Sequence, residues 1–544
     1  MPEDRPSVLT PDEASSPDAD LSALAPLRWP VFRMLWLVWL ASNTCMWMND
    51  VAAAWLMTSL TTSPVWVALV QTAATLPVFL FGLPSGALAD IVDRRRYYIA
   101  TQFWVAAVAL ALCATVLTDT VTPPLLLLLT FANGIGLAMR WPVYSAVVPE
   151  IVPRAQLPAA LALNGVTMNA SRIVGPLLAG ALIASVSSAA VFVLNALLSV
   201  ASAVALVRWR REHKPDPRGR QRLWSAMRVG VQFVAQSPRL KAVLLRIALF
   251  FFHSTALIAL LPLVARNLRG GDAATFTVLL AAMGVGAIAT AFLMPRLRQL
   301  FARDRLVLVG TLTQSAATLA VAFAPNVAVA VPAMFVGGMA WIATANSLSV
   351  SAQLALPDWV RARGMAMYQM AIMGATAFGA GLWGQVASFS SVQTSLLVAA
   401  CTGGAGMWLL QRVVADLQIE EDLTPSNALP VPDAPQPPAS GQVLVTVEFR
   451  IDPERAADFV RVMQESRRSR LAQGALSWHL LRDITDPSRY TEQIVDESWA
   501  EHLRRFDRVT AADIALRERK LAFHLDEAPP RVTRYVIDAA PSSS

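Results

Sequence analysis

The chain has 544 residues, of which 55% are apolar and only 15% are charged, and its net charge is +7. A typical soluble domain carries about 25% charged residues, so this composition argues against an entirely soluble protein and indicates a membrane protein. The length predicts more than one domain. The basic residues recur in short clusters between apolar blocks, which is typical of membrane orientation and argues against a nucleic-acid partner.

Neither the cysteines nor the N-terminal residues show the pattern of a disulfide framework, a metal site or a signal peptide. Cys45, Cys113 and Cys401 lie in apolar stretches without paired spacing, so we expect neither a disulfide framework nor a metal site, and no cofactor. Residues 1–27 are rich in Pro, Asp, Ser and Ala and lack the apolar core of a cleaved signal peptide. We therefore expect them to form a disordered cytoplasmic tail.

Apolar segments that are long enough to cross a membrane follow the N-terminal tail. A membrane helix needs about 20 largely apolar residues, and several uncharged blocks are about twice that length, which indicates two helices joined by a short turn. The pattern predicts twelve spans, at 32–58, 64–89, 97–118, 123–148, 158–185, 189–208, 242–266, 273–296, 305–324, 327–353, 361–387 and 390–412.

The distribution of Lys and Arg predicts the orientation of these spans. The turns after odd-numbered spans are almost free of basic residues, with Arg266 and Arg269 as exceptions, whereas the connections after even-numbered spans are basic. Basic connections face the cytoplasm. We therefore expect a multi-pass protein of the bacterial inner (plasma) membrane, surrounded by the lipid bilayer, with both chain ends in the cytoplasm.

The chain also repeats itself at an offset of 204 residues. The aligned glycine pairs are Gly134 with Gly338, Gly175 with Gly379, and Gly180 with Gly384. Chance among small residues is the alternative, because glycine is common in membrane helices. The repeat predicts two six-helix halves, 28–208 and 242–414, joined by a basic cytoplasmic linker at 209–241.

One motif lies at the end of the second span, where residues 86–96 read G-A-L-A-D-I-V-D-R-R-R. It resembles the cytoplasmic loop motif of the major facilitator superfamily, G-x-L-A-D-R-x-G-R-R. Gly86 would allow close packing, Asp90 would pair with a base from a neighbouring span, and Arg94 and Arg95 match the motif's basic pair. Ile91 and Asp93 depart from the pattern, and the alternative is an ordinary cluster of arginines that stops membrane transfer.

A second motif lies in the fifth span. Gly175, Pro176 and Gly180 match the G-P-x-x-x-G antiporter motif of the same superfamily. Proline bends a helix, and glycine lets a helix approach its neighbour closely. In the superfamily this motif accompanies export rather than uptake.

Ionisable residues at membrane depth are costly and indicate function. Asp50, next to Asn49, is the candidate proton-coupling carboxylate, and Arg140 and Arg172 are candidates to pair with it or to hold an anionic substrate. The alternatives are a cap at the outer interface for Asp50 and a side chain reaching the cytoplasmic face for Arg140. The superfamily's usual span-4 arginine would fall at Thr130, so that proton-linked motif is degraded.

The C-terminal region is of another kind. A Pro-rich linker at 415–440 precedes residues 441–544, whose pattern predicts strand, helix, two strands, a helical region at 498–524 and a last strand. The order βαββαβ is that of the ferredoxin-like fold, and the region resembles the small monooxygenases of antibiotic biosynthesis, which dimerise. Because no cofactor or metal spacing is present, we expect no enzyme activity here, but homodimerisation or a regulatory role.

As a whole, the chain resembles the exporter branch of the major facilitator superfamily that includes the enterobactin exporter and the transmembrane secretion effectors. This resemblance implies an all-α, twelve-helix fold and proton-driven, rocker-switch efflux of a siderophore-like or drug-like small molecule. Two alternatives remain at this point. One is a metabolite importer of the same fold, and the other is a membrane sensor that signals through its soluble domain.

Overall fold

The computed structural model describes residues 24–153, 156–208, 223–268, 272–414, 422–426, 428, 432 and 441–537. These residues form two compact units. The first contains the described residues of 1–215, 247–346 and 369–412, and the second those of 216–246, 347–368 and 413–544. Most of the predicted N-terminal tail and of the Pro-rich linker lies outside the described residues. A short 3-10 helix, Ala25–Arg28, begins within that tail, and its Ala25 is buried, so these last residues of the tail are ordered and not disordered as predicted.

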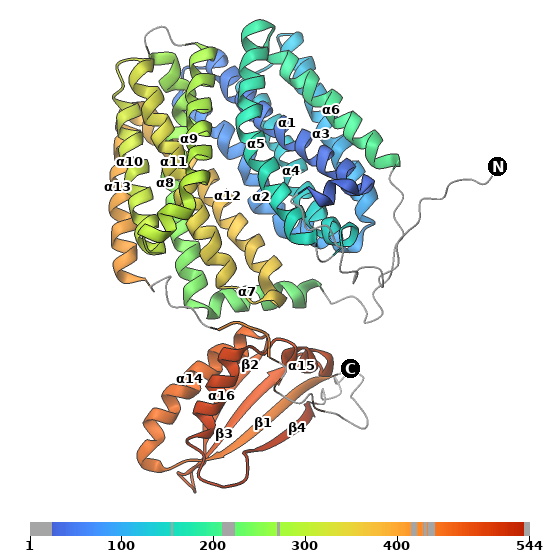
Figure 1. Cartoon of the computed structure of the whole chain (residues 1–544), viewed down its shortest axis with the longest axis vertical. Coiled ribbons are helices and arrows are strands. Elements are labelled where there is room, and N and C mark those ends of the chain that lie inside the picture. Colours follow the sequence, from blue (N-terminus) through green and yellow to red (C-terminus); the bar gives the residue numbers. More distant parts are fainter. Residues whose placement is uncertain are drawn as a thin grey trace, which may run out of the picture. The chain divides into compact units, whose positions relative to one another are not determined.

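Long helices make up the first unit, and two of them, α8 and α12, begin in the second unit (Figure 1). The N-terminal half contains α1 (Pro30–Leu60), α2 (Pro64–Ile91), α3 (Arg94–Leu117), α4 (Pro123–Ile151), α5 (Leu157–Ser185) and α6 (Ser188–Arg208). The C-terminal half contains α8 (Pro238–Asn267), α9 (Ala273–Leu300), α10 (Arg303–Ala322), α11 (Val327–Leu354), α12 (Asp358–Phe389) and α13 (Val392–Val413). Several begin with proline, whose fixed φ suits the first helical turn.

Each predicted span coincides with one of these helices to within about four residues at either end. Among the described residues, ten helices are long and apolar enough to cross a membrane, namely all of these except α1 and α12. Polar residues of α1, including Ser42, Asn43 and Asn49, lower its apolarity, and α12 begins with charged residues. The surface of the bundle is also apolar, with exposed Leu110, Phe292 and other large side chains, as contact with lipid requires.

The glycines that align in the sequence occupy equivalent places in the two halves. A Cβ atom on Gly134 of α4 would lie 2.7 Å from the Ala74 carbonyl oxygen of α2, and one on Gly338 of α11 would lie 1.9 Å from the Met283 carbonyl oxygen of α9. Since α9 occupies in the second half the place that α2 has in the first, the predicted repeat extends from residue identity to helix packing.

The second unit contains helix α7 (Leu223–Gln236), which the sequence reasoning did not predict within the basic linker, and a small antiparallel sheet with its helices. The strands are β1 (Gln442–Arg450), β2 (Ser477–Arg482), β3 (Arg489–Asp496) and β4 (Arg531–Ile537), in the order β2-β3-β1-β4. The helices are α14 (Ala456–Ala472), α15 (Trp499–Phe506) and α16 (Ala511–Leu521). The last two replace the single helical region expected at 498–524.

The break between α15 and α16 has a local cause. Thr510 accepts a hydrogen bond from the Asp513 backbone N–H, and the Asp513 carboxylate accepts one from the Thr510 backbone N–H. This reciprocal arrangement is a capping box, which starts a new helix. Residues 507–510 therefore form a turn rather than a helical continuation.

Helices α14 and α16 cover one face of the sheet (Figure 1). The core beneath them contains Val445, Phe449, Phe459 and Ile494. Because side chains alternate along a strand, every second residue of β3 points into this core, and one of these residues is a carboxylate, Glu492, which is fully buried.

Glu492 is held by a complete set of partners. The Lys520 ammonium donates a hydrogen bond to its carboxylate at 3.2 Å, Trp478 Nε1 donates at 2.8 Å and the Ser466 hydroxyl donates at 2.9 Å, while Arg470 lies at 4.0 Å. Burial alone would raise the pKa of Glu492. The two cations and the hydrogen bonds outweigh burial and lower that pKa to about 2.

We predict that Glu492→Gln destabilises the sheet and its helices by about 3–5 kcal/mol near neutral pH, because it leaves the Lys520 cation buried without its counter-charge. The native pKa of Glu492 is depressed, so its stabilisation is complete above pH 4.5 and is lost as the pH falls toward 2. Hydrogen exchange of β3 amides in the full chain, corrected for intrinsic rates, measures the free-energy difference. That difference should shrink at about pH 3.

Glu448→Gln is the matched control, because it removes a charge from a more exposed ion pair with Arg489 on the same sheet. Its effect should be small at either pH. A Glu492→Gln effect no larger than that of the control would contradict the assignment.

Candidate substrate and coupling site

Among the described residues of the N-terminal half, helix α1 carries more buried polar residues than any other helix, and the two candidate arginines pack against it. Arg140, from α4, is 4% exposed, and its Nη1 donates to the Ser42 carbonyl oxygen at 3.3 Å. Its guanidinium also lies 5.5 Å from the centroid of the Trp39 ring. Arg140 is therefore buried inside the bundle, in contact with α1.

Arg172, from α5, packs against α1 about two turns beyond the Trp39 contact of Arg140. Its guanidinium sits 5.4 Å from the centroid of the Trp47 ring, and within the described residues its Nε has no hydrogen-bond partner. Next to it, the hydroxyls of Thr44 and Ser171 are 3.2 Å apart and tie α1 to α5. A cation over an aromatic face is stabilised by about 0.5–2 kcal/mol, which leaves its hydrogen-bonding capacity for another group.

Asn49 and Asp50 continue the series on α1. Asn49 is fully buried, and neither its side-chain nitrogen nor its oxygen has a partner among the described residues. Asp50 lies eight residues beyond Ser42, which corresponds to about 12 Å along the helix axis. In the described part of the chain, no ion pair joins Asp50 to Arg140 or Arg172, so the three candidate charges are not brought into pairs.

Several polar neighbours of Arg140 were missed by sequence reasoning that considered only charged residues at depth. Trp39 stacks on Tyr144 with ring centroids 4.1 Å apart, and the Tyr144 hydroxyl donates to Asn164 at 2.6 Å. Gln102 of α3 donates to the Ser42 hydroxyl at 3.1 Å. A count of buried polar and aromatic residues on each helix face would have found this cluster.

The second half also contains a buried cation, since Arg246 of α8 is fully buried. His253 of the same helix is half-buried: its Nδ1 lies 2.9 Å from the Leu249 carbonyl oxygen, and its Cβ lies 2.8 Å from where a Gly403 Cβ would be.

The residues of the loop motif have mainly helix-end roles where they are described. Arg95 Nε donates to the Leu206 carbonyl oxygen at 3.2 Å, and its Nη2 donates to that of Val207, so it binds the C-terminal carbonyls of α6. Asp93, which stands where the motif has glycine, accepts from the Arg96 backbone N–H at 2.9 Å and caps α3, which begins at Arg94. The surroundings of Gly86 and the side chain of Asp90 lie outside the described residues. The pairing of Asp90 with a base from a neighbouring span therefore stays a prediction.

The antiporter-motif residues lie where helices meet. A Cβ atom on Gly175 would lie 2.5 Å from Trp47 Cβ of α1, and one on Gly180 would lie 1.9 Å from Thr277 Oγ1 of α9, in the opposite half. Pro176 is buried between them within α5. The repeat partner of Gly180 acts likewise, since a Cβ on Gly384 of α12 would lie 2.4 Å from Ala68 Cβ of α2.

The two halves therefore meet along two equivalent seams, α5 with α9 and α12 with α2. The Thr72 hydroxyl donates to the Ala377 carbonyl oxygen at 2.8 Å across the second seam. Arg266, an exception in the charge pattern, donates to the Thr58 carbonyl oxygen at the end of α1 and joins the halves at that end of the bundle.

A bundle of apolar helices in two equivalent halves, with polar residues enclosed inside it, is the architecture of a multi-pass membrane transporter of the major facilitator type. The match to known families agrees. Residues 21–542 match the family described as "Transmembrane secretion effector", and the chain belongs to that family.

Related proteins carry transport names. The chain is 25% identical to the MFS-type transporter YfiS of Bacillus subtilis (strain 168), over 62% of this chain and 82% of that protein. It is 19% identical to the staphyloferrin A transporter of Staphylococcus aureus (46% of this chain and 63% of that protein). It is 26% identical to macrolide efflux protein A of Enterococcus faecalis (36% and 61%). The chain thus spans less than two thirds of the length of the last two relatives.

Solved structures share the fold. A bacterial homolog of the human lysosomal transporter Spinster, in an inward-facing and occupied conformation, matches with a TM-score of 0.58 at 15% identity, over 71% of this chain and 97% of that one. The nucleoside transporter NupG matches with a TM-score of 0.56 at 12% identity, over 70% of this chain and 98% of that one.

We predict that Gly180→Ala separates α5 from α9 and lowers the stability of the full chain by about 1–3 kcal/mol. The new methyl group would lie 2.6 Å from Thr277 Cβ, so a rotamer change of Thr277 cannot relieve the clash. Thermal unfolding in detergent, followed by tryptophan fluorescence, measures the loss. Gly165→Ala on the same helix is the control, because a Cβ there meets nothing within 4 Å. If Gly180→Ala and Gly165→Ala unfold at the same temperature, the close contact of α5 with α9 at Gly180 does not contribute to stability.

Proposed function

We propose that this protein exports small amphipathic molecules, siderophore-like or drug-like, by proton antiport. The observation that carries the proposal is the set of polar groups on and against α1, in which the Asn49 amide and the Arg172 Nε have no partner among the described residues. Burying such groups in an apolar bundle is costly, so they are retained for a ligand. The G-P-x-x-x-G motif and the efflux and siderophore names of two relatives support export.

The proposed architecture follows the superfamily. The ten apolar helices together with α1 and α12 make twelve spans in two halves, which rock about the two seams in alternating access. In this proposal the bundle lies in the bacterial inner membrane with both chain ends in the cytoplasm, an orientation that the basic connections favour. Residues 441–537, with their β2-β3-β1-β4 sheet, form a ferredoxin-like domain without catalytic activity.

We also propose that this domain mediates homodimerisation. The face of the sheet opposite α14 carries exposed Leu481, Tyr535 and Ile537, which nothing in the described part of the chain covers. An open sheet face of this kind fits a second copy of itself. A monomeric mass for the full chain in detergent would contradict this assembly.

Asp50 is the proposed proton carrier. It is a carboxylate on α1 next to Asn49, whose side chain has no partner among the described residues. We predict that Asp50→Asn lowers proton-driven accumulation in inverted membrane vesicles about tenfold or more, since about 1.4 kcal/mol of lost coupling already gives a factor of ten. Asp50→Glu, which keeps a carboxyl group, should retain coupling. Energised accumulation by Asp50→Asn at the wild-type level would refute the role.

Arg172 is the proposed contact for a negatively charged part of the substrate. We predict that Arg172→Ala raises the KM for an anionic siderophore about tenfold, as loss of a charge-assisted hydrogen bond would, and leaves that for a cationic macrolide nearly unchanged. Arg172→Lys keeps the charge and should show a smaller effect. Equal losses for both substrates would indicate a structural role for Arg172 and contradict the contact.

A further inference from the structure

Helix α7, in the linker between the two halves, lies against the soluble domain. Arg228 of α7 forms an ion pair with Glu497, at 2.6 Å, just beyond the end of β3. One turn further along, the Gln232 amide donates to the Ala475 carbonyl oxygen at 3.3 Å. Both contacts come from one face of α7 and reach two neighbouring loops of the domain.

The loop after α14 is shaped for this contact. Gly474 has a φ of +109°, a conformation that residues with a side chain rarely adopt. A Cβ atom there would lie 2.9 Å from Val229 Cγ2 of α7 and 2.9 Å from Arg508 Nη1. Glycine therefore meets two requirements at this position: the backbone turn and the close approach of α7.

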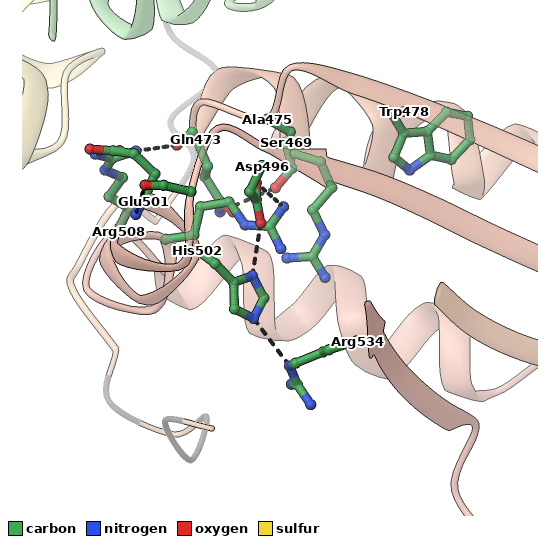
Figure 2. A network of polar contacts seen from close by, with 12 residues as sticks. Ser469, Gln473, Ala475, Trp478, Asp496, Glu501, His502, Arg508 and Arg534 are labelled. Carbon is green, nitrogen blue, oxygen red and sulfur yellow. Dashed lines mark hydrogen bonds and ion pairs between the residues drawn. The ribbon is translucent and has the colours of Figure 1, made fainter. Parts of the chain in front are cut away.

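Arg508 extends the contact to the start of α12. Its side chain is nearly buried, and it donates to the Gln473 carbonyl oxygen at 2.6 Å and to Glu501 at 2.9 Å (Figure 2). The guanidinium also lies 5.2 Å from the centroid of the Trp359 ring, near the beginning of α12. Phe233 of α7 meets the same indole edge-on at 5.7 Å, so domain, linker helix and α12 converge on Trp359.

The loops that make these contacts are fixed by the polar interior of the domain. His502 lies between Asp496, 2.8 Å from Nδ1, and Arg534, which donates to Nε2 at 3.1 Å (Figure 2). Arg505 also donates to Asp496, at 3.1 Å. This network ties α15 to the end of β3, immediately before Glu497, so the ion-pair partner of Arg228 projects from a fixed position.

The helices touched by this interface continue into the transport unit. Only Ser237 separates α7 from α8, and its hydroxyl oxygen accepts from the Leu240 N–H at the start of α8. α12 is one continuous helix, and further along it Gly384 makes the seam with α2. A displacement of α7 or of Trp359 is thus transmitted to helices that form the junction between the halves.

We propose that the C-terminal domain regulates transport by docking on α7 and Trp359, and that docking favours the conformer described here, in which Arg266 and Thr58 join the halves. An interaction made in one conformer shifts the population toward it. Loss of this docking therefore increases the fraction of molecules in which the C-terminal end of α1 has separated from the N-terminal end of α9. The regulation of transport rests on the proposed function, but the docking does not.

The test is a charge swap in the full chain. Arg228→Glu and Glu497→Arg each place like charges together, and the double variant restores an ion pair in reversed order. Two readouts need no substrate. One is hydrogen exchange of α7 amides, and the other is the rate at which a cysteine replacing Phe276 reacts with a maleimide, since Phe276 lies against Trp55 of α1 with ring centroids 6.1 Å apart.

We expect each single reversal to raise both rates about two- to fivefold, the range of a partly exposed ion pair, and the double variant to return them toward wild type. Glu465→Arg is the control, because it breaks an exposed pair with Arg519 of the same length, 2.6 Å, within the domain. It should change neither rate.

Unchanged α7 exchange in the single variants would overturn the docking. Raised α7 exchange with an unchanged labelling rate would overturn the regulatory coupling. Equal effects of the Glu465→Arg control would also overturn the proposal, since the response would then reflect general loosening of the domain. Because neither readout uses transport, each of these results is distinct from a failure of the export assays.

Discussion

The membrane-embedded unit depends on two seams that leave no room for a Cβ atom. Lipid is as apolar as a leucine side chain, so apolar side chains gain little by meeting one another in a membrane, and close packing at small residues must supply the attraction between helices. Gly180 and Gly384 provide it at equivalent places, where α5 meets α9 and α12 meets α2. The same approach of α5 to α1 at Gly175 encloses the polar residues of α1.

The buried polar residues on α1 and against it lower the stability of the bundle. The Asn49 amide, which has no partner among the described residues, and the Arg172 guanidinium, which lies over an indole, both lower the stability of an apolar bundle. Arg140 differs, because it binds the Ser42 carbonyl oxygen and stabilises the contact of α4 with α1. Arg140 of α4 and Arg172 of α5 therefore contact α1 in different ways, one through a backbone hydrogen bond and the other through an aromatic ring.

Features set by composition over many residues were predictable from the sequence, and features set by single contacts were not. About twenty apolar residues in a row specify a membrane helix, so the spans agree with the helices. The repeated glycines predicted equivalent halves because each must meet a neighbour. Helix α7 was not predicted because its fourteen residues lie in a basic linker. The hydrogen-bond partner of Arg140 was not predicted because it is a backbone carbonyl of another helix, and every residue has such a group.

Arg266 binds the Thr58 carbonyl oxygen at the end of α1. In the proposed orientation this guanidinium has crossed the membrane during insertion, against the bias that keeps basic residues in the cytoplasm. The C-terminus of a helix carries a partial negative charge, and α1 is made long before α8 leaves the ribosome. In that orientation the C-terminal carbonyls of the first helix stabilise the charge of an arginine that is translocated later.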